Sequence, residues 1–421
     1  MSREEQFLKF CVRASIDKGI FEQNRENFTK DLDWQYLIKQ GRKARLLALI
    51  YKDLSAIDSL IPSIPPGIWQ VLRRNYYATA SRNALLWEEL TRIVNCFQRQ
   101  GVQCILLKGA ALLYNIYPNI ALRSMDDIDL LVRRKDLTRA HQVLTALGYA
   151  APPHSQDFLR EAGAAPINSL MYNPGNNYYF PVHLHWHLIN STWPLSFLVS
   201  NIDIDEVFAT VEPTRLNGVN CLRLNPELFL IHLAHHAFIH SFSRLILLCD
   251  IVRLLAHYRG ILNWRLLAVW AERFNLSGVV YYTLLFTQQA LQYEIPQLEY
   301  LRPKRQNFLQ KILRRCARRQ TFSYQLSLLG YFSLSRGLLG KLRFIGKTIL
   351  PSSHVLANDF SLPFSQLTFA HYYQRLAKNF VRLFPYNTIK RNYRRNTSHM
   401  LVPEVSIESN SPAGELAVER S

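Results

Sequence analysis

Two acidic residues separated by one position are the first candidates for chemistry in this sequence. Asp127 and Asp129 begin a segment whose remainder, Leu130-Leu131-Val132, is apolar and predicts a buried β-strand. Alternate residues of a strand point to one face, so the two carboxylates are expected about 7 Å apart at the backbone. Paired carboxylates bind hard divalent cations such as Mg²⁺ or Mn²⁺, which bridge to substrate phosphates. We therefore predict that Asp127 and Asp129 are metal ligands, although a solvated strand end shows the same pattern.

A glycine turn upstream of this strand strengthens the prediction. The segment Leu106-Leu107-Lys108-Gly109-Ala110-Ala111 predicts a strand that passes through a turn into a helix. Such a turn directs backbone N–H groups and the positive end of the helix towards an anion. Arg123 lies four residues before Asp127 and can reach the same place. The predicted nucleotide-binding residues are therefore Lys108, Gly109, Ala110 and Arg123.

The elements that position these residues form a compact α/β unit. Its expected order is strand, helix, strand, helix and hairpin, at residues 102–107, 110–114, 127–132, 135–147 and 170–188. Helical periodicity dominates elsewhere: residues 68–100 predict one long helix, and Asn225-Pro226-Glu227 predicts the start of another.

Several segments carry a family resemblance. They are Leu107–Leu112, Arg123, Asp127–Val132, Gly148-Tyr149, His185-Trp186, and the helical residues His236, His240, Arg244, Leu245 and Asp250. Together they resemble the uncharacterised bacterial nucleotidyltransferase-like family of the polymerase-β superfold, over most of residues 30–355.

The resemblance implies a mostly helical α+β protein with a small mixed-sheet palm flanked by helical domains. It also implies transfer of a nucleoside monophosphate from an NTP to an unidentified acceptor, such as a small molecule, a glycan precursor or a protein. The two acids would be the ligands of Mg²⁺ or Mn²⁺. The expected domains are N-terminal helical (1–100), palm (101–190), helical (191–300), basic and largely helical (301–400), and a disordered acidic tail (401–421).

The sequence departs from the superfold at two places. Gly109-Ala110 replaces the usual Gly-Ser or Gly-Gly, and His183 occupies the position of the usual third carboxylate. His183 can serve as the general base, because its ordinary pKa is near neutral. Alternatively, the chain is a catalytically silent nucleotide-binding or membrane-peripheral adaptor. A further alternative is that a loop supplies the third carboxylate, from Asp203, Asp205 or Glu206.

Other histidines allow rival interpretations. His183, His185 and His187 alternate on one strand and could bind Zn²⁺, although packing of His185 and Trp186 is favoured. His232, His236 and His240 recur at helical spacing. A metalloprotease is rejected because Leu233 stands where the catalytic glutamate would be. His236, His240, Arg244 and Asp250 are instead expected to fix the helical domain against the palm and to face the acceptor side of the cleft.

Charge is concentrated near the C-terminus. Residues 301–400 contain 19 Lys and Arg and one acid, Asp359, within a chain of net charge +19. This region predicts either contact with an anionic membrane surface or a solvated face that only attracts NTP to the site. Binding of nucleic acid is a less favoured interpretation than these two. No uninterrupted apolar span, secretory signal or CxxC pair is present, which predicts a cytoplasmic protein, free or at a membrane surface.

Overall fold

The computed structural model describes residues 2–17, 32–56, 58–155, 159, 168–175, 180–189, 202–303, 308–319, 324–335 and 337–383. The chain divides into two compact units, residues 1–376 and 377–421. The elements below lie in the first unit, except that the last helix continues into the second. The expected acidic tail falls outside the described residues.

A six-stranded mixed sheet forms the α/β part of the molecule. Its strands are β1 (Cys104–Leu106), β2 (Ile128–Val132), β3 (Ser169–Tyr172), β4 (Val182–His185), β5 (Glu212–Leu216) and β6 (Val219–Arg223). They lie in the order β3-β4-β2-β1-β6-β5. β2 is parallel to β4 and antiparallel to β1, so the central strand β2 is buried along its whole length. The mostly helical α+β prediction is confirmed.

The hairpin of β5 and β6 is a difference from the sequence analysis, which expected helices after residue 190. It adds to the sheet because β6 pairs in parallel with β1. Pro213 argues against a strand in β5, but β5 is an edge strand, where a missing backbone donor is tolerated.

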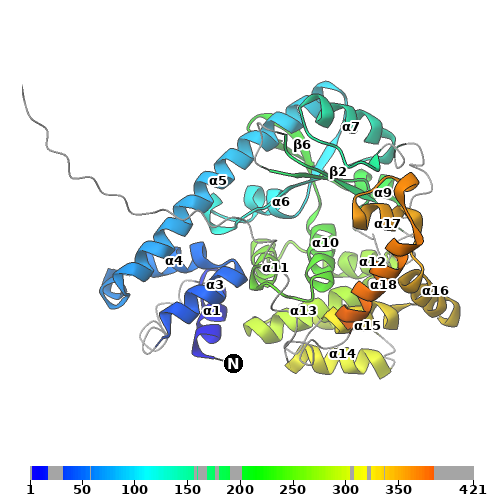
Figure 1. Cartoon of the computed structure of the whole chain (residues 1–421). Helices are drawn as coiled ribbons and strands as arrows, with labels where there is room; N and C mark the ends of the chain where they lie inside the picture. The colour runs from blue at the N-terminus through cyan, green and yellow to red at the C-terminus, as the bar shows by residue number, and fades with distance from the viewer. Residues whose placement is uncertain are drawn as a thin grey trace, which may run out of the picture. The chain divides into compact units, whose positions relative to one another are not determined.

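The N-terminal helices are α1 (Arg3–Ala14), α3 (Trp34–Ala44), α4 (Leu47–Ser55) and α5 (Pro66–Arg99), with a 3-10 turn η1 (Asp58–Ser63). The long helix α5 extends from the N-terminal helices to the sheet (Figure 1). Asn83 of α5 is buried and donates hydrogen bonds to the backbone carbonyls of Ile120 (2.5 Å) and Arg123 (2.8 Å). The predicted helix over 68–100 is confirmed, and it fixes the chain that leads into β2.

Short helices connect the strands. They are α6 (Lys108–Asn115), η2 (Ile120–Leu122), η3 (Arg134–Asp136), α7 (Leu137–Ala146) and α9 (Ile204–Ala209). Helices α10 (Pro226–Ile239), α11 (Leu245–His257), α12 (Trp264–Arg273) and α13 (Ser277–Leu291), with η5 (Leu298–Leu301), pack together after the sheet. α10 begins as predicted, since the Asn225 side chain accepts a hydrogen bond from the Leu228 N–H.

The basic region forms further helices: α14 (Phe308–Arg319), α15 (Tyr324–Leu334), α16 (Gly337–Ile349), α17 (Ser353–Phe360), η6 (Phe364–Gln366) and α18 (Phe369–Leu383). No helix among the described residues is long and apolar enough to span a membrane. The proposed domain limits at 100, 190 and 300 stay predictions.

Candidate active site

All the predicted site residues except Ala110 line a cavity of about 450 Å³ between the sheet and α10. Its lining includes residues of the glycine turn, of β2 and β4, and of α10 and α11. They are Lys108, Gly109, Arg123, Asp126, Asp127, Asp129, His183, His185, His232, His235, His236, His240 and Arg244, with Arg45 and seven others. A cavity of this size fits a small-molecule ligand.

Asp129 is at the centre of the polar contacts in this cavity. It is only 3 % exposed, and its Oδ1 accepts a hydrogen bond from Lys108 Nζ at 2.6 Å. Burial alone would raise the pKa of Asp129. The Lys108 ammonium and the hydrogen bonds from His183 and His185 outweigh it and hold this pKa well below its ordinary value. Asp129 is therefore ionised at neutral pH, as a metal ligand must be.

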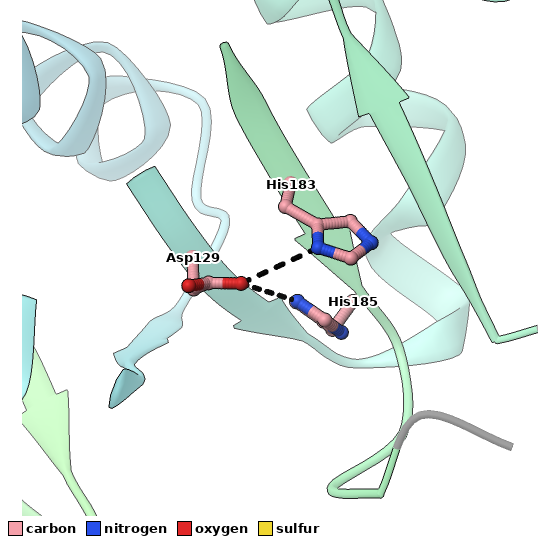
Figure 2. Close-up of side chains that lie close together, drawn as sticks. All are labelled: Asp129, His183 and His185. Atoms are coloured by element: carbon pink, nitrogen blue, oxygen red, sulfur yellow. Dashed lines mark hydrogen bonds and ion pairs between the residues drawn. The ribbon is translucent and has the colours of Figure 1, made fainter. Parts of the chain in front are cut away.

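His183 and His185 lie on β4, next to Asp129 on β2. The parallel pairing places His183 directly opposite Asp129. Both imidazoles point at Asp129 Oδ1, His185 Nε2 at 2.9 Å and His183 Nδ1 at 3.4 Å (Figure 2). The candidate ligand atoms of these three residues lie within 4.8 Å of one another, which is close enough to share one metal ion. The favoured interpretation of His185 as packing alone thus missed its contact with Asp129.

Asp127 faces the same cavity but stands outside this group. It lies one residue before the start of β2, and no hydrogen bond joins it to the described residues around it. Burial, followed by the negative charge of Asp129, raises the pKa of Asp127 to about 6. A cation between the two carboxylates would reverse this effect and favour the ionised form of both.

The order of strand, turn and helix is as the sequence predicts, but the helix begins before Gly109 and not at Ala110. β1 ends at Leu106, and α6 starts at Lys108, whose φ of 43° lies in the left-handed region. That conformation costs a residue other than glycine about 1–2 kcal/mol. The strained residue, Lys108, is also the one whose Nζ donates to Asp129, so the backbone strain is located at the site. The first turn of α6 also leaves backbone N–H groups without partners inside the helix.

Gly109 is required by its neighbours in this turn. A Cβ at position 109 would lie 2.5 Å from Arg123 Nη1 and 2.6 Å from Met125 Sδ. Arg123 cannot move aside easily, because it is buried and its Nε and Nη2 donate to both carboxylate oxygens of Asp250 at 2.9–3.2 Å. Burial would lower the pKa of Arg123, but Asp250 raises it above its ordinary value. Arg123 thus lines the cavity as a fixed positive charge.

Helix α10 contributes a wall of neutral histidines. Burial, followed by the charge of Lys108, lowers the pKa of His232 to about 4. Burial and the neighbouring histidines lower the pKa of His235 to about 3. His232 Nδ1 donates to the Leu188 carbonyl at 2.8 Å, which leaves its Nε2 as an acceptor, buried without a partner among the described residues. Such nitrogens can accept hydrogen bonds from a ligand.

The expectation for the later polar residues is met in part. Asp250 does fix α11 to the palm, through Arg123 and through Tyr117, whose hydroxyl donates to it at 2.7 Å. His236, His240 and Arg244 line the cavity, as expected for residues that face the cleft.

Some predicted residues do not reach the cavity. Ala110 is buried behind Gly109 and is not part of the described lining. The candidates for a third acid are used elsewhere, because Asp205 pairs with Arg133 at 3.3 Å and Glu206 with Arg273, while Asp203 caps α9. His187 contacts the backbone of Ile189 and not Asp129. None of these three acids is part of the described cavity lining, so the role of His183 stays a prediction.

The sequence analysis missed several residues at the cavity, among them Arg45, Asp126 and His235. Arg45 at the end of α3 forms an ion pair with Asp126. His235 lies between the noted His232 and His236. No sequence pattern indicates that Arg45 belongs to the site, because it is distant in sequence from the turn. Its position in the cavity depends on how α3 packs.

Comparison with known families agrees with this geometry. A family model described as an uncharacterised nucleotidyltransferase matches residues 30–292, more than half of the chain. The chain belongs to this family. The match contains the glycine turn, both acids, His183 and the histidines of α10, and it confirms the resemblance found in the sequence. No curated protein and no solved structure matches the chain.

Proposed function

We propose that this protein transfers a nucleoside monophosphate from an NTP to a hydroxyl-bearing acceptor in the cavity between β2, β4 and α10. The observation that carries the proposal is the meeting of Lys108, Asp129 and His183 at one carboxylate oxygen, beside the start of α6. The family membership supports the reaction class. The acceptor would be a small molecule, a glycan precursor or a protein.

The residues fit a divalent cation, and they favour Mn²⁺ over Mg²⁺. Asp129 and His185 would hold it, with Asp127 within the same cavity, and His183 would remain available as the base. Mg²⁺ prefers oxygen ligands, whereas imidazole nitrogen suits softer first-row metals. When bound, the cation supplies positive charge that stabilises the transferred phosphoryl group.

The remaining steps fall to residues of this chain. The backbone N–H groups at the start of α6, including that of Gly109, bind the triphosphate. Lys108 and Arg123 neutralise the negative charge that develops on the phosphates. His183 accepts the proton of the acceptor hydroxyl as its oxygen attacks the α-phosphorus. The bond from the α-phosphorus to the bridging oxygen then breaks, and pyrophosphate leaves.

A second candidate function rests on the same histidine. With His183 in place of a third carboxylate, the chain could bind nucleotide without transferring it, as a silent nucleotide-binding or membrane-peripheral adaptor. The wild-type protein would then show binding but no turnover.

Pyrophosphate release from each of the four NTPs, with Mn²⁺ or Mg²⁺, separates the two candidates. If the protein is a transferase, His183→Ala and Asp129→Asn each remove the wild-type release, because the base or the metal ligand is lost. If wild type releases none and His183→Asp restores it, the adaptor is correct. Release that survives Asp129→Asn contradicts both.

A further inference from the structure

Among the described residues, helix α16 contacts α15 through one side. Phe344 is 5 % exposed and lies on Phe332 of α15, with ring centroids 5.8 Å apart. The other side presents six large apolar side chains that are 43–75 % exposed: Leu338, Leu339, Leu342, Ile345, Ile349 and Leu350. At 100° per residue, Leu338, Leu342, Ile345 and Ile349 follow one line along the helix. We call these six residues the α16 face.

Basic residues flank the α16 face on both sides. Helical geometry places Arg343 and Lys347 along one edge and Lys341 along the other. Lys341 Nζ lies 5.8 Å from the centroid of the Phe332 ring. α16 itself contains no acidic residue. The exposed apolar line is therefore bordered by positive charge.

Helix α18 begins with a similar arrangement. Phe369, Tyr373 and Leu376 recur at spacings of four and three, and they are 84 %, 73 % and 42 % exposed. Asp359, the only acid of residues 301–400, is bound to Arg375 at 2.5 Å.

We propose that the α16 face binds the surface of an anionic lipid bilayer. An interfacial helix buries its apolar side in the headgroup region while flanking lysines and arginines contact lipid phosphates. α16 has 13 residues, too few to span a bilayer, so it would lie in the membrane plane. This region lies beyond residues 30–292, so the proposal is independent of the nucleotidyltransferase site.

Charge and side-chain type favour a bilayer over other partners. In a symmetric dimer through this face, the basic edges of two copies would oppose each other. Nucleic acid binds through basic grooves and aromatic stacking, but the centre of this face is leucine and isoleucine. An anionic bilayer matches both the apolar centre and the positive border.

Co-sedimentation with vesicles tests the proposal. The full chain is mixed with phosphatidylcholine vesicles, with and without phosphatidylglycerol, at low and high salt. We expect binding only to the anionic vesicles and weaker binding at high salt. Leu342→Glu/Ile345→Glu should reduce it at least about tenfold, because two apolar contacts are lost and two negative charges are added.

The matched control is Ile261→Glu/Val269→Glu, which changes two exposed apolar residues elsewhere (70 % and 61 % exposed). The control should bind vesicles like wild type, and both variants should keep their NTP binding. The proposal is overturned if wild type ignores anionic vesicles or if the Leu342/Ile345 variant binds equally well. It is also overturned if that variant instead abolishes a dimer seen by light scattering, or binding of a nucleic-acid probe.

Discussion

At the scale of single residues, one carboxylate organises the site. Lys108 Nζ and the imidazoles of His183 and His185 all contact Asp129 Oδ1. Asp127 lies in the same cavity, and its pKa is raised. A cation that binds Asp129 would compete with the Lys108 ammonium for the same carboxylate oxygen. Metal and triphosphate binding should therefore be coupled, since the triphosphate provides a new partner for the released ammonium.

Gly109→Ala tests the packing of the turn. The new Cβ would overlap Arg123 Nη1, which Asp250 holds in place, so we expect the free energy of unfolding to fall by about 1–3 kcal/mol. Urea denaturation measures it. Gly67→Ala is the control, because nothing lies within 4 Å of its Cβ; it should be neutral or stabilising. Equal stability of the Gly109→Ala variant and wild type would show that Arg123 is not held as described.

At the scale of elements, a buried ion pair connects the palm to the helices. Arg123 precedes β2, and Asp250 lies on α11; both side chains are at most 10 % exposed. A buried charge without its partner is costly, although the intact pair contributes little net stability.

We expect Asp250→Asn to lower the free energy of unfolding by about 3–5 kcal/mol, because Arg123 would keep its charge without a counter-ion. Combining it with Arg123→Met should cost less than the sum of the two single changes. Chemical denaturation of the four proteins in this double-mutant cycle provides the measurement. Strict additivity would mean that the two residues do not stabilise each other.

Local patterns predicted the elements that carry the chemistry, and long-range packing decided the rest. The turn at Lys108, the strand of Asp129 and the start at Asn225 follow from short-range periodicity and capping. The contact of His185 with Asp129 depends on the pairing of β4 beside β2, which the sequence does not specify. The β5–β6 hairpin was not predicted. Pro213 argues against a strand when only the sequence is considered, although an edge strand such as β5 tolerates it.

At the scale of the whole molecule, buried neutral histidines make stability depend on pH. A histidine whose pKa is lowered by folding stays neutral in the folded state and binds a proton only on unfolding. The stability that it contributes is complete above its unfolded pKa of about 6.5 and is lost as the pH falls towards the folded pKa.

His235 provides the test of this effect, with a pKa of about 3 in the folded protein. Between pH 8 and pH 5, it should account for about 2 kcal/mol of the loss in unfolding free energy. His235→Phe should therefore lose about 2 kcal/mol less than wild type over that interval, measured by urea denaturation at both pH values. The same loss in both proteins would show that His235 is protonated when folded.

Calorimetric titration of the four NTPs in the presence of Mn²⁺ tests the central claim most directly. The claim is that Asp129 anchors a metal and nucleotide site. We predict metal-dependent binding of at least one NTP to wild type and a loss of about 10–100-fold in Asp129→Asn. The control Glu299→Gln removes an equal charge from an exposed acid outside the cavity lining and should bind like wild type. Undiminished NTP binding by a folded Asp129→Asn protein would contradict the account.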